Sequence, residues 1–72
     1  MTIGDLAKVF SGRVMLTALA YDKKTKEYYS FRSVGEFPNL GYAKVYRQNE
    51  IRDILPDGRG VLWVDFIEWV EV

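Results

Sequence analysis

The spacing of apolar residues predicts a short helix at the start of the chain. Four apolar residues between positions 3 and 10 recur at helical intervals, which favours an amphipathic helix over residues 3–10. Thr2 and Asp5 have the spacing of a capping box, in which the two residues satisfy each other's backbone amides. We therefore expect the helix to begin directly after Thr2.

Two strand-like segments separated by a polar turn predict a β-hairpin. Residues 13–21 are almost continuously apolar, as expected for a strand inside a sheet. Residues 22–26 are polar, and residues 27–34 form a second β-rich segment. Side chains alternate along a strand, so Tyr29 and Phe31 are expected on one face. We expect Tyr28 and Arg32 on the opposite face.

The second half of the chain is less regular. We expect a loop over residues 35–41 and a third strand over residues 42–46, where apolar and polar residues alternate. Asn49 is a suitable N-cap for a helical turn over residues 50–55. A last strand is predicted over residues 60–72.

The last strand carries apolar side chains on both faces. Leu62, Val64 and Phe66 alternate without interruption, and we assign them to the core. The opposite face then holds the remaining large apolar side chains of the strand, which are Trp63, Ile67 and Trp69.

Together these elements predict a single α+β domain over residues 1–72. We expect a three- to four-stranded, mainly antiparallel sheet with a short N-terminal helix and a second short helix before the last strand. A helix on one side of a small sheet leaves the other side uncovered. The uncovered face is where we expect the function to lie.

Composition narrows the possible functions. A 72-residue chain buries only about 60% of its unfolded surface, so the core is thin. The chain contains no Cys and no His, which removes disulfides and the usual ligands of zinc, haem and iron–sulfur clusters. We expect no metal and no cofactor. The longest mostly apolar stretch is too short to span a membrane, so we predict a cytoplasmic protein without membrane contact.

Catalysis is not expected. Paired carboxylates must converge for acid–base chemistry. Asp65 and Glu71 lie on one face of the last strand but about 20 Å apart at roughly 3.3 Å per residue, and Glu68 points the other way. The serines lack any histidine to act as a base. The sequence therefore predicts a protein that is not an enzyme.

The net charge is zero, but the charges are separated along the chain. Residues 8–32 hold six bases and two acids, whereas residues 50–72 hold six acids and two bases. One interpretation is that oppositely charged elements pack together in a small sheet. The other is a bipolar surface that steers partners or stacks subunits.

Binding of another macromolecule is the function that composition favours. Aromatic and basic residues interleave in residues 28–32 and 42–47, as in proteins that bind single-stranded nucleic acid by stacking its bases on aromatic side chains. A neutral chain has no excess of cations to neutralise phosphates, so a protein partner is favoured and nucleic acid is the alternative. A thin core also makes a homodimer, or a self-assembling structural subunit, an open possibility. The candidate partner-binding residues are Trp63, Ile67, Trp69, Tyr28, Arg32, Tyr42, Tyr46 and Arg47.

The first residues also carry a resemblance. The opening Met1-Thr2-Ile3-Gly4-Asp5-Leu6 has the form Met-Thr-hydrophobic-x-acid-Leu and is followed by a short helix, hairpins and a terminal apolar strand. In these features the chain resembles small accessory proteins of bacteriophages and mobile elements. The resemblance implies a protein, such as an inhibitor of host defence, that acts by occluding a protein surface. Such proteins are often acidic, which this chain is not, and the resemblance assigns no site residues.

Overall fold

The computed structural model describes residues 1–72 and contains four strands, one α-helix and one 3-10 helix. In chain order the elements are α1 (Ile3–Ala7), β1 (Arg13–Asp22), β2 (Tyr28–Phe37), η1 (Leu40–Tyr46), β3 (Ile51–Pro56) and β4 (Val61–Val70). This is a small α+β fold, as the sequence predicts. None of its helices has both the length and the apolar character needed to cross a membrane.

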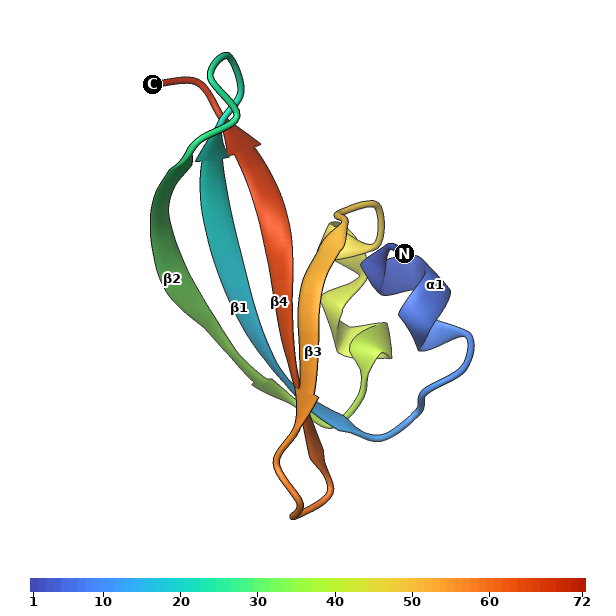
Figure 1. Cartoon of the computed structure of the whole chain (residues 1–72). Helices are drawn as coiled ribbons and strands as arrows, with labels where there is room; N and C mark the ends of the chain where they lie inside the picture. Colours follow the sequence, from blue (N-terminus) through green and yellow to red (C-terminus); the bar gives the residue numbers. More distant parts are fainter.

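The four strands form one mixed sheet in the order β2-β1-β4-β3. It consists of two antiparallel hairpins, β1–β2 and β3–β4, that are joined side by side. The joint is a parallel pairing of β1 with β4 that runs in register from Arg13 opposite Val61 to Asp22 opposite Val70. Helix α1 and η1 lie on one side of the sheet, as Figure 1 shows. The expectation of one uncovered face is confirmed.

The core lies between the helices and the central strands. Nine side chains are buried, and all of them are apolar. They are Ile3, Leu6, Val14, Leu16, Ala18, Leu40, Ala43, Val64 and Phe66. Leu62 packs at the edge of this cluster, so the prediction that Leu62, Val64 and Phe66 face the core is confirmed. With so few buried residues, the domain depends strongly on each of them.

The capping box at the start of α1 forms as predicted. The Thr2 hydroxyl accepts a hydrogen bond from the Asp5 amide at 3.1 Å, and the Asp5 carboxylate accepts one from the Thr2 amide at 3.0 Å. The helix ends at Ala7, which is shorter than the predicted residues 3–10. Phe10 still packs against the core, from the segment that follows the helix.

The predicted third strand over residues 42–46 is wrong, because this segment belongs to η1. Leu40 and Ala43 are buried and Tyr46 packs against the core, so inward-facing residues recur every third position. That period belongs to a 3-10 helix, in which residues three apart lie on one side. The Asn39 side chain caps the element by accepting a hydrogen bond from the Gly41 amide at 2.8 Å.

The predicted helical turn over residues 50–55 is also wrong, because β3 occupies Ile51–Pro56. A register shift between Ile51 and Asp53 adds a residue to the strand. Ile51 and Ile54 can therefore both face the helix side although they are three residues apart, which imitates helical spacing. Asn49 does not cap a helix. Its side-chain amide donates to the Ile67 carbonyl at 2.9 Å and ties the start of β3 to β4.

The β1–β2 hairpin is confirmed, and β2 continues beyond the predicted end at Val34 to Phe37. Register shifts interrupt its pairing with β1, one of them between Ala20 and Tyr21. This shift changes the predicted faces. Tyr28 contacts Tyr21 and therefore shares a face with Phe31, which lies opposite Leu19. The prediction that Tyr28 and Arg32 share a face is therefore wrong, because Arg32 lies opposite Ala18 on the helix side.

The turn between β3 and β4 is held by one carboxylate. Asp57 accepts hydrogen bonds from the backbone amides of Arg59 at 2.7 Å and Val61 at 3.2 Å. Gly58 and Gly60 have φ values of 78° and 89°, a region in which residues other than glycine are strained. The amide of Arg59, followed by that of Val61, lowers the pKa of Asp57 below its ordinary value.

We expect Asp57→Asn to change how stability depends on pH. The carboxylate has a lower pKa when folded than when unfolded, so its stabilising effect is present above the unfolded pKa and disappears as pH falls through the folded one. The variant should be less stable than the wild type at pH 7 and converge with it in strong acid. Urea denaturation across this pH range measures the effect. Glu71→Gln, which removes an exposed carboxylate 3.7 Å from Lys23, should follow the wild-type profile.

We expect Phe66→Ala to remove most of the stability of the domain and to lower its melting temperature sharply. Phe66 is fully buried, and removing a buried ring costs about 3–5 kcal/mol. Domains have only about 5–15 kcal/mol of stability, and small ones lie at the low end. The matched control is Phe31→Ala, because this ring is 67% exposed and its loss should cost about 1 kcal/mol or less. Circular dichroism melting curves of both variants would decide; equal melting temperatures would contradict the assignment of the core.

Candidate protein-binding face

The side of the sheet away from the helices is called the open face here. In-register pairing and side-chain alternation define its members. Its principal members are Met15, Thr17, Leu19 and Tyr21 from β1, Tyr28, Phe31, Ser33 and Glu36 from β2, Asp53 and Leu55 from β3, and Trp63, Asp65, Ile67 and Trp69 from β4. The Arg52 guanidinium reaches the same face at the Tyr21 hydroxyl.

The open face exposes unusually large apolar side chains. Trp63 and Trp69 are 43% and 47% exposed, and Leu55 is 68% exposed. With Tyr28 and Phe31, the four exposed rings leave roughly 400 Å² in water, taking about 200 Å² for a whole aromatic side chain. The total accessible surface is 4986 Å², against roughly 4600 Å² expected for a compact monomer of this mass. The surplus fits a sheet that is covered on one side only.

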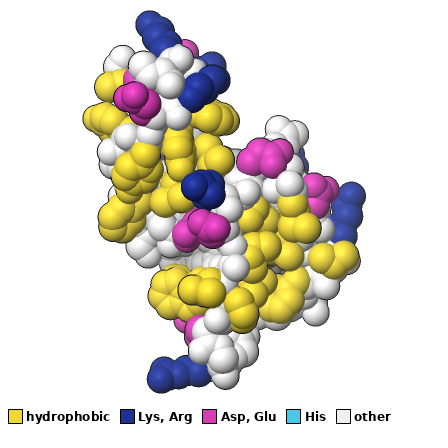
Figure 2. Space-filling view, in the orientation of Figure 1, with side chains coloured by type: hydrophobic (Ala, Val, Ile, Leu, Met, Phe, Trp, Pro, Cys, Tyr) yellow, Lys and Arg dark blue, Asp and Glu magenta, His cyan; other side chains and the backbone are white.

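One end of the open face is an aromatic cluster. The Tyr21 ring lies 5.8 Å from the rings of both Tyr28 and Trp69, measured between centroids. The Lys26 ammonium lies 4.6 Å from the centroid of the Trp69 ring, a distance at which a cation is attracted to the ring. Figure 2 shows Lys and Arg side chains at the tip of the β1–β2 hairpin, with hydrophobic side chains below them. Aromatic contacts thus hold the rings of this cluster together.

The middle and the other end of the open face carry charge. Arg13, at the start of β1, forms an ion pair at 3.2 Å with Glu36, near the end of β2. Arg52 donates to the Tyr21 hydroxyl at 3.4 Å, and this hydrogen bond raises the pKa of the Arg52 guanidinium. Asp53 and Asp65 face each other across β3 and β4. Neither of these two carboxylates belongs to an ion pair.

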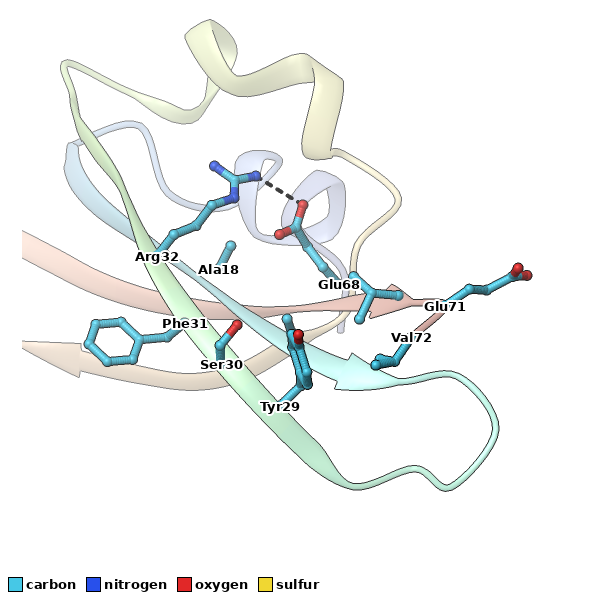
Figure 3. Close-up of a pocket in the computed structure, with 10 residues that line it drawn as sticks. Ala18, Tyr29, Ser30, Phe31, Arg32, Glu68, Glu71 and Val72 are labelled. Atoms are coloured by element: carbon cyan, nitrogen blue, oxygen red, sulfur yellow. Dashed lines mark hydrogen bonds and ion pairs between the residues drawn. The ribbon is translucent and has the colours of Figure 1, made fainter.

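The helix side of the sheet also has a groove, in a part of the sheet that η1 does not line. It is a groove of about 290 Å³ between the β1–β2 hairpin and the end of β4, lined by residues that include Ala20, Tyr29 and Val70. Beside this groove Arg32 donates to the Glu68 carboxylate at 2.9 Å (Figure 3). Arg32 also donates to the Tyr46 hydroxyl at 3.3 Å. The Tyr46 hydroxyl, and then Glu68, raise the pKa of Arg32, so the guanidinium stays charged.

The structure divides the eight predicted partner-binding residues among three places. Four of them share the open face, and these are Trp63, Ile67, Trp69 and Tyr28. Arg32 and Tyr46 lie on the helix side, where the Tyr46 ring packs on Phe66 with centroids 4.7 Å apart. Tyr42 is exposed on η1, and Arg47 follows η1 with its guanidinium bonded to the Lys44 carbonyl. The eight residues therefore do not form one surface.

Sequence reasoning missed several members of the open face. Leu55 was hidden by the predicted helix over residues 50–55. Tyr21 was predicted only as the last residue of a strand, and its ring contacts with Tyr28 and Trp69 were not foreseen. The pair of Asp53 and Asp65 depends on the register of β3 with β4, which no local pattern reveals. Only Asp65 carries a signal of its own, since it interrupts the alternation of large apolar residues at positions 63, 67 and 69.

No group of three or more His, Cys, Asp or Glu side chains is arranged to hold a metal ion. Comparisons with models of protein families, with curated proteins and with solved structures found no match to this chain.

We expect single-stranded oligonucleotides to bind no tighter than the roughly 10⁻⁴–10⁻⁶ M typical of non-specific contacts. The aromatic and basic residues that would form such a site lie on different sides of the sheet, and the open face carries acids at its centre. Fluorescence anisotropy at low and at high salt tests this. A submicromolar complex that weakens steeply with salt would make nucleic-acid binding the leading function.

Proposed function

We propose that this protein is a non-enzymatic protein-binding module that uses its open face to cover a surface of its partner. The observation that carries the proposal is the exposure of four aromatic rings on one uncovered sheet face. Tryptophan and tyrosine are the residues on which binding energy concentrates in protein interfaces. An inhibitor or accessory factor of the phage type, acting in the cytoplasm, is the role we favour.

The parallel pairing at the centre of the sheet supports this proposal. Parallel strands normally occur in sheets that are covered on both faces. Here β1 and β4 are parallel, yet only their helix side is covered within the chain. A partner on the open face would complete an arrangement that this chain alone leaves half finished.

The size of the open face limits the kind of complex. Burying roughly 400 Å² of aromatic surface yields on the order of 10 kcal/mol, which is close to the cost of association itself. A stable complex must therefore also engage Leu55, Met15 and Leu19. The two longest dimensions of the chain are 35 and 21 Å, so one face of the sheet measures at most roughly 700 Å². This area is close to the roughly 800 Å² that each partner buries in a standard interface.

Two other functions remain open as alternatives. Single-stranded nucleic-acid binding would use the aromatic rings for stacking, but the cations beside the rings, Lys26 and Arg52, are balanced by Asp53 and Asp65 on the same face. A self-assembling structural subunit would use the exposed edges of β2 or β3, or the open face itself. Both alternatives predict different partners for the same aromatic residues.

We expect Trp69→Ala to keep the fold and to lose the partner. Trp69 is 47% exposed, so its truncation should cost about 1–2 kcal/mol of stability, whereas hot-spot tryptophans contribute 2 kcal/mol or more to binding. Tyr42→Ala is the matched control, because Tyr42 is 69% exposed but lies on η1. Affinity capture followed by calorimetry with the purified partner compares the two variants.

Thermal melting of both variants completes the test. If Trp69→Ala melts as early as a core variant, the ring is part of the core and the interface lies elsewhere. If Tyr42→Ala rather than Trp69→Ala loses the partner, the binding surface is on the helix side. Either result would contradict the proposed function.

A further inference from the structure

The open face has two facing carboxylates where β3 and β4 meet. Asp53 lies directly opposite Asp65, so their Cα atoms are about 4.5–5.5 Å apart. Like charges directly opposite each other destabilise a sheet. The four ion pairs of the chain use other acids, namely Glu36, Glu50, Glu68 and Glu71. Neither Asp53 nor Asp65 forms an ion pair. Arg52, whose guanidinium bonds the Tyr21 hydroxyl on the same face, attracts Asp53, which leaves one cation beside two carboxylates.

This acid pair lies in the middle of the apolar surface. Asp65 is the fifth of the ten residues of β4, and β4 is an inner strand. On one side along the strand lie Trp63 and, beside it, Met15. On the other side lie Ile67 and its neighbour Leu19. A molecule that covers these apolar residues must also cover Asp65, and one that extends to Leu55 on the edge strand β3 meets Asp53 as well.

We propose that the open face selects a partner protein whose contacting surface is apolar with a lysine or arginine inside it. This inference rests on the proposed function. A purely apolar cover would bury two carboxylates with only the Arg52 guanidinium near them, and a buried charge without a partner costs more than the contacts around it return. A cation placed between Asp53 and Asp65 removes both their mutual repulsion and the cost of their burial. The two carboxylates thus weaken the binding of neutral and acidic partner surfaces.

The same geometry disfavours the other occupants. A second copy docked by a two-fold axis through the centre of this face would bring the Asp53–Asp65 pair close to its own equivalent, which places four carboxylates together. Nucleic acid would bring phosphates to the same acids. A basic protein surface is the occupant whose charge complements the centre of the face.

Three synthetic amphipathic helical peptides test the inference. They share a leucine-rich stripe without aromatic residues and differ at one position in the middle of the stripe, which holds Lys, Gln or Glu. The chain has only two tryptophans, Trp63 and Trp69, and both lie on the open face. Their emission therefore reports occupation of this face directly. We expect the Lys peptide to bind at least about tenfold more tightly than the Glu peptide, with the Gln peptide between them.

The Asp53→Asn, Asp65→Asn double variant should bind the three peptides with equal affinity. It should also fold, because it removes a like-charge pair. The control is the Glu27→Gln, Glu71→Gln double variant, which removes two acids outside the open face and should keep the preference for Lys. Melting curves of both double variants accompany the titrations.

Each contrary outcome has a separate meaning. Equal binding of all three peptides by the wild type would overturn the inference but leave an apolar docking face and the proposed function standing. Binding of none of the peptides would also overturn it. Sedimentation equilibrium showing a dimer that the Asp53→Asn, Asp65→Asn variant tightens would assign the face to a second copy instead. The proposed function fails separately, when Trp69→Ala keeps the partner that the wild type captures.

Discussion

The parallel pairing of β1 with β4 is the constraint on which the rest of this structure depends. It joins two antiparallel hairpins into one sheet and runs without a register shift over both strands. Because the pairing is in register, residues at matching positions of the two strands share a face. Val14, Leu16 and Val64 then meet the helices together. A slip of one residue would turn every apolar side chain of one strand to the wrong side.

The small number of helical residues limits what this sheet can cover. Helix α1 and η1 are short, and together they enclose nine buried residues on one side. The residues of the opposite side lie on the same two strands and are just as bulky, as Trp63 and Ile67 show. The chain has no further element with which to cover them (Figure 1). Their exposure follows from the position of α1 and η1 on the other side of the sheet, whereas their size and aromatic character do not and call for a functional explanation.

Local patterns predicted the parts of the fold that depend on local spacing. The capping box of Thr2 and Asp5 and the β1–β2 hairpin follow from neighbouring residues, and alternation along β4 separated Phe66 from Trp63. The segment from Leu40 to Pro56 was misread because its periods are ambiguous. In η1 the apolar residues Tyr42 and Val45 are exposed, so residues 42–46 carry a strand-like pattern that does not reflect burial. The register shift in β3 places Ile51 and Ile54 on the helix side at helical spacing.

The candidate site was predictable only in part for a related reason. The aromatic residues of β4 could be assigned to one face from their positions in a single strand. The pairing of Asp53 with Asp65, and of Tyr28 with Tyr21, requires the register between strands, including the places where it shifts. The parallel joint of β1 and β4 brings together segments separated by more than half of the chain. Such pairings are set by the packing of the whole core, which a local window of sequence does not contain.

Buried and exposed roles are therefore divided between alternate residues of the same strands. In β4 the even positions Val64 and Phe66 stabilise the fold, and the odd positions Trp63 and Trp69 remain available for a partner. The division lets the open face keep features that a core would not tolerate, such as the facing carboxylates of Asp53 and Asp65. It also means that the surface is preorganised, because its exposed residues are held by neighbours that are buried. A rigid sheet face loses little conformational freedom on association, which suits a small domain with little binding area to spare.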